Sequence, residues 1–200
     1  MTVQMAPACR GISFMAATAA IAAFAMFGPV WLAPSAANAD PIALKPWHEK
    51  VPPGFVLPAM DGSKIGLDAQ RGRIVLVHFF ATWCEPCREE LPALRRLAAR
   101  AEPGSLAVLA ISVAEVELRV RRFLESTPVN FPVLLDQDRA VAKAWNISAL
   151  PSTVILDSNL KPRLTAEADF AWDGIEPSAL IDMLKPETTK QTTTSSHPGG

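Results

Sequence analysis

Residues 74–87 read Ile-Val-Leu-Val-His-Phe-Phe-Ala-Thr-Trp-Cys-Glu-Pro-Cys, an apolar β-branched run followed by two cysteines three positions apart. The run predicts a buried strand. Behind the second cysteine the apolar residues have helical spacing, so the cysteines are expected on a strand-to-helix turn. Two thiols at this spacing can close a small disulfide and open it again, which indicates redox chemistry.

The turn predicts a different role for each cysteine. The N–H groups and the dipole of the first helical turn stabilise a thiolate, and should lower the pKa of Cys84 below the free value of about 8.5. Cys84 is therefore the expected nucleophile. Cys87 is expected to be more buried and to attack the mixed disulfide that Cys84 forms with a substrate.

The rest of the chain predicts an α/β fold. Residues 106–112 are almost continuously apolar, as in a central strand covered by helices on both faces. Residues 55–57 and 64–67 predict a short N-terminal hairpin around the turn Asp61-Gly62. The patterns further along predict a helix at 116–124, a strand at 131–135, a helix at 140–145, strands at 153–156 and from 162, and a helix at 176–184.

Together these pieces resemble the TlpA-like (ResA-like) thioredoxin-fold disulfide reductases. The resemblance rests on Trp-Cys-Glu-Pro-Cys at 83–87 after an apolar strand, on Pro92, and on Ala-Leu-Pro-Ser-Thr at 149–153. It implies a thioredoxin fold with a central mixed sheet flanked by helices, an N-terminal β-hairpin and the central insertion of this branch. It also implies a protein-disulfide reductase that needs no cofactor.

The residues expected to support the site are Trp83, Glu85, Pro86, His78 and Pro151, and Leu150 is expected to bind the substrate. The resemblance implies that Pro151 is a cis-proline beside the disulfide, which leaves the backbone of Leu150 free to pair with an extended substrate segment. Trp83 is expected to cover the disulfide, the alternative being ordinary packing at a strand end. Glu85 and Pro86 are expected to set the balance between thiolate and disulfide. A carboxylate at Glu85 favours a reductant, unless it only points into water.

His78 is a departure from the family, which often carries an acid or an asparagine at this position. Its imidazole could relay a proton to or from Cys87 during resolution of the mixed disulfide. The favoured alternative is a hydrogen-bonded core histidine. Further along, Arg88, Glu89 and Glu90 are expected to form a solvated face beside the site.

The amino-terminal segment predicts export. Arg10 is the only charged residue before Asp40, and residues 11–33 are uncharged and long enough to cross a bilayer core, which needs about 20 residues. Residues 37–39, Ala-Asn-Ala, fit signal peptidase and predict cleavage before Asp40, with an uncleaved membrane anchor as the alternative. In either case Arg10 should stay inside and the catalytic part outside, which predicts a periplasmic location.

The predicted organisation has four parts: a signal peptide or anchor at 1–39, a linker at 40–52, a thioredoxin-like domain at 53–185 and a disordered tail at 186–200. The chain has 200 residues, half of them apolar, and a net charge of −1. This leaves room for one sizeable core and gives no sign of a nucleic-acid partner. Because Cys9 lies in the targeting segment, the exported part keeps only Cys84 and Cys87.

The expected partners are disulfide-containing envelope proteins, the Cys-x-x-Cys-His segment of an apocytochrome c among the options. The resemblance implies that electrons arrive from cytoplasmic thioredoxin through an integral membrane thiol reductase. A thiol oxidase or isomerase is the main alternative, because it shares the site and differs in redox poise. A copper-delivering assembly factor of the same broad fold is a further alternative, but such proteins resemble a pattern with a wider Cys-x-x-x-Cys and a distal histidine, and both are missing here.

The sequence disfavours two further classes of site. A structural zinc site needs four ligands, and the exported part has no second thiol pair, so no metal is expected. A peroxidase would need a threonine and a proline placed ahead of its cysteine. Thr82 stands at another spacing and the proline is missing.

Overall fold

The computed structural model describes residues 44–168 and 170–185. The predicted targeting segment at 1–39 and the predicted tail at 186–200 lie outside these residues. No helix in the described part is long and apolar enough to cross a membrane.

The elements, in chain order, are β1 (Lys45–Pro46), β2 (Val56–Pro58), β3 (Lys64–Gly66), the 3₁₀ turn η1 (Leu67–Gln70), β4 (Ile74–Phe80), α1 (Glu85–Arg100), β5 (Leu106–Val113), α2 (Glu117–Ser126), β6 (Val133–Asp136), α3 (Ala140–Ala144), β7 (Ser152–Leu156), β8 (Pro162–Glu167), the 3₁₀ turn η2 (Trp172–Gly174) and α4 (Pro177–Leu184).

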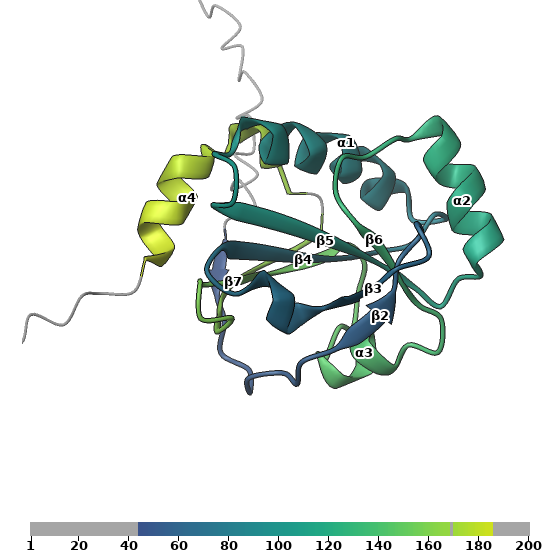
Figure 1. Ribbon diagram of the computed structural model, residues 1–200, viewed down its shortest axis with the longest axis horizontal. Helices are drawn as coiled ribbons and strands as arrows, with labels where there is room; N and C mark the ends of the chain where they lie inside the picture. Colours follow the sequence, from purple (N-terminus) through teal and green to yellow (C-terminus); the bar gives the residue numbers. More distant parts are fainter. Residues whose placement is uncertain (1–43, 169, 186–200) are drawn as a thin grey trace, which may run out of the picture. The chain divides into compact units, whose positions relative to one another are not determined.

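A mixed sheet of six strands in the order β1-β8-β7-β4-β5-β6 forms the centre of the molecule (Figure 1). Strands β4, β5 and β6 are parallel, while β7 runs antiparallel to β4 and β8 antiparallel to β7. All seven residues of β4 are buried, which explains why this strand is an almost continuous apolar run. The predicted thioredoxin fold is confirmed.

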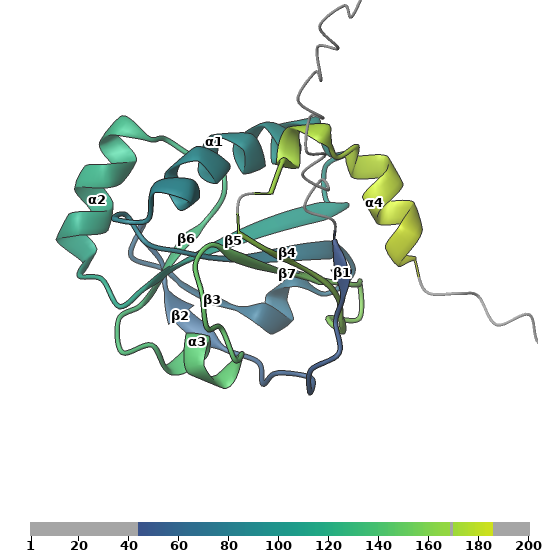
Figure 2. The same cartoon turned by 180° about the vertical axis from the view of Figure 1, so that it is seen from behind.

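Helices α1 and α4 cover one face of the sheet, and the β2–β3 hairpin lies with α3 on the other (Figures 1 and 2). Alternate residues of β4 serve the two faces, as the strand period of two requires. Val75, Val77 and Phe79 pack on the hairpin side. Ile74 and Leu76 pack beneath α1 and α4. His78 belongs to this second set by its position, which places it beneath α1.

The N-terminal hairpin forms where the sequence predicts it. Leu57 pairs with Ile65 in antiparallel register, and Gly62 in the connecting turn has φ +85°, a conformation that glycine adopts without steric cost. The hairpin is attached to the sheet because the N–H of Met60 donates to the carbonyl of Val133 at 2.9 Å.

The expected linker at 40–52 contains a strand that the sequence does not indicate. Residues Lys45–Pro46 form β1, which pairs with the outer side of β8 (Figure 2). The N–H of Trp47 then donates to the carbonyl of Arg163 at 2.9 Å. Two residues are too few to show an alternating pattern, and their partner lies far along the chain. A proline is tolerated here because β1 is an edge strand.

Candidate active site

Cys84 and Cys87 form a disulfide with an S–S distance of 2.04 Å at the start of α1. Cys84 is the residue that caps the helix, and its Sγ accepts the N–H of Cys87 at 3.4 Å. Pro86 lies in the first turn, where its missing N–H removes no helical hydrogen bond. Cys84 is 6% exposed and Cys87 is fully buried, so the predicted order of exposure is confirmed.

A buried carboxylate holds the loop that carries the cysteines. Glu115 follows β5 and is only 4% exposed. Its two oxygens accept the N–H of Thr82 at 2.8 Å and the Thr82 hydroxyl at 2.6 Å, and Ser112 donates a further hydrogen bond at 2.9 Å. The sequence interpretation missed Glu115. The available signal was an acid at the carboxyl end of a buried strand that pairs with β4.

The Leu150–Pro151 peptide bond is cis, which confirms the isomer that the family resemblance implied. Leu150 packs against the cluster that contains both cysteines. Within the described residues, neither the N–H nor the carbonyl of Leu150 makes a hydrogen bond. This backbone is therefore open to an extended segment of another chain.

Two of the predicted support residues, Trp83 and Glu85, lie on the surface on either side of Cys84 in the chain. Trp83 is 67% exposed although it is large and apolar, so it is available for contact with a partner. Glu85 is exposed, and its carboxylate lies 3.5 Å from the guanidinium of Arg88. The roles of these side chains in the reaction stay predictions.

Glu90 corrects the sequence interpretation of a solvated face. Arg88 and Glu89 are exposed as expected, but Glu90 is only 2% exposed. Its carboxylate accepts the N–H of Phe170 at 2.7 Å and the indole Nε1–H of Trp172 at 3.0 Å. Glu90 is buried because it stands three residues after Cys87, on the face of α1 that packs against the sheet.

His78 is completely buried beside Glu90. Its Nδ1 lies 2.9 Å from the hydroxyl of Thr153 and 3.7 Å from a carboxylate oxygen of Glu90, while its Nε2 has no hydrogen-bond partner among the described residues. Burial lowers the pKa of His78 from 6.5 to about 3, so the ring is neutral at neutral pH. These contacts match the core-histidine interpretation, and the proton relay stays a prediction.

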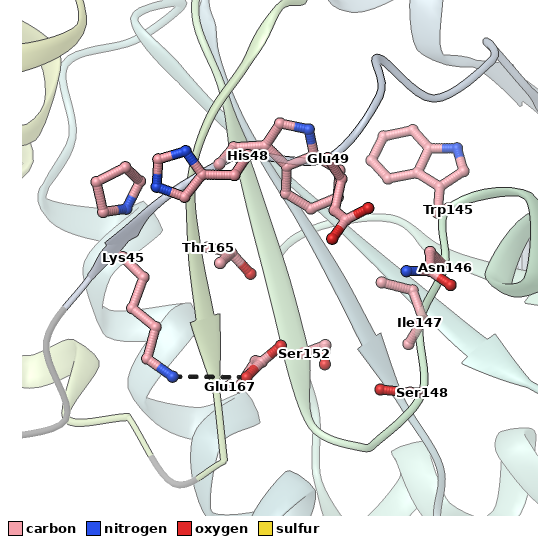
Figure 3. Close-up of a pocket in the computed structure, with 12 residues that line it drawn as sticks. Lys45, His48, Glu49, Trp145, Asn146, Ile147, Ser148, Ser152, Thr165 and Glu167 are labelled. Atoms are coloured by element: carbon pink, nitrogen blue, oxygen red, sulfur yellow. Dashed lines mark ion pairs between the residues drawn. The ribbon is translucent and has the colours of Figure 1, made fainter.

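Two cavities lie near this end of the sheet. One, of about 360 Å³, opens beside Trp83 and Leu150. The other, of about 570 Å³, lies where β1 and β8 meet the loop after α3, and contains neither cysteine (Figure 3). Lys45 and Glu167 form an ion pair of 3.6 Å in it. The two cavities share Ile147 and Ser148, and neither is lined by a cysteine. The first is the nearer to the active-site turn along the chain, because Trp83 in its lining directly precedes Cys84.

The arrangement is suited to thiol-disulfide exchange. A reversible sulfur pair, an exposed aromatic ring and an unpaired backbone segment meet at one place on the surface. Within residues 44–168 and 170–185, no group of three or more His, Cys, Asp or Glu side chains is placed to hold a metal ion. Thr82, the threonine considered for the peroxidase alternative, donates its hydroxyl hydrogen bond to Glu115.

The chain is similar to proteins with this chemistry. Residues 49–163 match the AhpC/TSA family. The thiol-disulfide oxidoreductase ResA of Bacillus subtilis (strain 168) is 37% identical over 105 residues, which are 52% of this chain and 59% of the length of ResA. ResA of Geobacillus kaustophilus (strain HTA426) is 35% identical over 134 residues, with coverage of 67% and 76%.

A solved structure agrees in fold. The secreted disulfide oxidoreductase of Mycobacterium tuberculosis that is homologous to E. coli DsbE superposes with a TM-score of 0.54 at 18% identity, over 65% of this chain and 93% of that one. An identity this low speaks for the fold alone. The family match and the ResA relatives carry the assignment further: the chain belongs to the AhpC/TSA family and, within it, to the ResA-like thiol-disulfide oxidoreductases.

Proposed function

We propose that the protein is an exported reductase that acts on disulfides of envelope proteins through a Cys84/Cys87 dithiol-disulfide cycle. The observation that carries the proposal is the position of the two sulfurs. They lie at the N-terminus of α1, in the same apolar cluster as Leu150, whose backbone is open next to the cis-proline. A client chain can therefore pair with Leu150 while its own disulfide approaches Cys84.

In the proposed cycle the Cys84 thiolate attacks one sulfur of the client disulfide. The first client thiolate leaves, and a mixed disulfide forms. The Cys87 thiolate then attacks the Cys84 sulfur, closes the disulfide seen in the structure and releases the second client thiolate. Two electrons pass to the client, whose thiolates take up protons from water. The N–H of Cys87 and the helix dipole favour the attacking thiolate.

The dithiol must be regenerated from outside the protein. We propose an integral membrane thiol reductase as the electron donor, fed from cytoplasmic thioredoxin. Arg10, the uncharged residues 11–33 and the cleavage pattern at 37–39 support export to the periplasm. An apocytochrome c, as in cytochrome c maturation, is one candidate client, and a copper-site protein is another.

The direction of the reaction is proposed from the charge beside the thiolate. Glu85 adjoins Cys84, and a carboxylate there disfavours the reduced, negatively charged sulfur. A less stable dithiol gives up its electrons more readily, which favours a reductant. A reductase also requires that the redox potential of the Cys84/Cys87 couple lie below that of the client disulfide. The oxidase or isomerase alternative is therefore decided by the redox potential.

The first test is the equilibrium redox potential of the full chain, purified in detergent and titrated in glutathione and dithiothreitol buffers. We expect a single two-electron transition more reducing than the glutathione couple, and none in Cys84→Ser. A potential near the strongly oxidising end, about −120 mV, would make the protein an oxidase. If the wild-type protein shows no transition, the oxidoreductase proposal fails.

A further inference from the structure

The cavity of about 360 Å³ beside Trp83 and Leu150 is built at the carboxyl ends of three parallel strands. Strand β4 leads to Trp83, β5 to Ala114 and β6 to Arg139, and the loop before β7 closes the remaining side. Ligands of open α/β sheets bind at this end of the strands. The lining residues are Trp83, Val113, Ala114, Arg139, Ala142, Ile147, Ser148, Ala149 and Leu150.

Arg139 is the one charged residue among those that line this cavity. Its side chain is exposed and makes no hydrogen bond or ion pair with any described residue. The neighbouring carboxylates are occupied by the first turn of α3. Asp136 accepts the N–H of Ala142 at 2.8 Å, and Asp138 accepts the N–H of Ala140 at 3.0 Å. An unpaired cation therefore stands at the rim of an otherwise uncharged and mostly apolar cavity.

The backbone around the cavity is held in an uncommon conformation. Ala114 has φ +59° and Arg139 has φ +63°, in the left-handed region that side chains other than glycine seldom adopt. The surrounding structure fixes both residues. The N–H of Ala114 donates to the carbonyl of Asp136 at 3.0 Å, and the carbonyl of Arg139 accepts the N–H of Lys143 at 2.9 Å. Such conformations gather at ligand-binding sites, where surrounding contacts maintain them.

We propose that this cavity is a specificity subsite for the client polypeptide, and that it selects an apolar side chain close to the client's cysteine together with an adjacent acidic residue. The inference rests on the proposed function, because it places the client in a mixed disulfide with Cys84. The apolar side chain enters between Trp83 and Leu150. The acidic residue then pairs with Arg139.

Pairing of an extended client with Leu150 determines which client side chain faces the cavity. Once the client backbone pairs with Leu150, successive side chains point to opposite sides of the added strand. One of them faces the cavity while its neighbours stay at the rim, within reach of a long guanidinium side chain. The subsite therefore distinguishes client sequences by charge, which a purely main-chain mode of recognition does not do.

The test uses the reduced full chain in detergent and three synthetic peptides. Each peptide contains a Cys-x-x-Cys disulfide flanked by phenylalanine and by two aspartates, two asparagines or two lysines. Reduction is followed by stopped-flow tryptophan fluorescence at low salt. We expect the aspartate peptide to react about three- to five-fold faster than the lysine peptide, as for one exposed ion pair. The ratio should approach one as added salt screens the charges.

Two variants of Arg139 give the decisive comparison. Arg139→Asn removes the charge and Arg139→Asp reverses it, and both new residues tolerate the left-handed backbone. We expect the preference to vanish in the first variant and to invert in the second. The matched control is Lys143→Gln, because Lys143 is exposed on α3, the helix that Arg139 precedes, carries the same charge and lies outside the cavity lining. It should keep the wild-type preference.

The outcomes separate the two proposals. Equal rates for all three peptides in the wild-type protein, or an unchanged preference in Arg139→Asn, would overturn the subsite and leave the reductase proposal standing. An equal loss of preference in Lys143→Gln would also overturn it, because the effect would then come from the overall charge. If the asparagine peptide is not reduced at all, the proposed function itself fails. Urea unfolding curves that match the wild-type curve show that the variants are folded.

Discussion

His78 and Glu90 place an imidazole and a carboxylate 3.7 Å apart beneath α1, in a region closed to solvent. Burial of an ionisable group normally favours its neutral form, and this is the cause of the lowered pKa of His78. The buried carboxylate of Glu90 accepts hydrogen bonds from the N–H of Phe170 and the indole N–H of Trp172. The pair thus connects the central strand, the active-site helix and the segment before α4.

The lowered pKa predicts a pH-dependent stability that depends on His78. Between pH 6.5 and about 3 the unfolded chain binds a proton at this residue and the folded protein does not. Stability is therefore present above pH 6.5 and is lost as the pH falls, by up to about 1.4 kcal/mol per pH unit from this residue. Urea unfolding at several pH values should show a weaker loss in His78→Asn than in the wild-type protein.

Parallel curves for the two proteins would contradict this prediction. The same variant also addresses the proton relay, since a pH–rate profile of disulfide reduction that does not change in His78→Asn would argue against that role. The two measurements are independent. A residue can influence stability through its burial without taking part in the reaction.

At the residue scale, the sequence predicts what is local and misses what depends on distant partners. Cys84 and Cys87 are evident from their spacing alone. Glu90 could have been found from its helical position relative to Cys87, and was missed because acidic residues are usually solvated. Arg139 gave no signal, because the cavity that it lines is assembled from four separate segments.

Among the elements, the strands that alternate or are wholly apolar follow from the sequence. Strand β4 is the clearest case, and the β2–β3 hairpin follows from its turn residues. Strand β1 does not, because its two residues have no pattern and its partner β8 is distant in the chain. The short α3 is defined by tertiary contacts as well, with Asp136 bonded to the N–H groups of Val141 and Ala142.

Trp145 directly follows α3 and is predicted to hold the hairpin side of the molecule together. Its ring packs against Phe55 and Phe79, with centroids 5.6 and 5.7 Å away, and its Nε1–H donates to the carbonyl of Pro53 at 3.1 Å. Trp145→Ala should lower the free energy of unfolding by about 3–5 kcal/mol, because it leaves a cavity and an unpaired carbonyl. Urea denaturation measures this loss.

The control for this prediction is Leu118→Ala in α2. Leu118 is 56% exposed, so its truncation should change the free energy of unfolding by no more than about 0.5 kcal/mol. A loss in Trp145→Ala as small as that of the control would show that the hairpin does not depend on this ring.

For the molecule as a whole, the sequence makes a prediction about processing. If residues 1–39 are a signal peptide, the mature protein recovered from the envelope should begin at Asp40. Amino-terminal sequencing of the protein from the fractionated source cell tests this directly. A chain that retains residues 1–39 in the membrane fraction would indicate the anchor instead, and recovery in the cytoplasmic fraction would contradict export.

The pairing of β1 with β8 has a consequence for the behaviour of the molecule at high concentration. The two outermost strands of the described sheet have two and four residues. The second, β6, is also partly covered, because Ala59 bridges to Leu134 and Met60 donates to Val133. Short edges, one of them also covered, give other chains little to extend by strand pairing. We therefore expect the protein to resist strand-mediated self-association as its concentration rises.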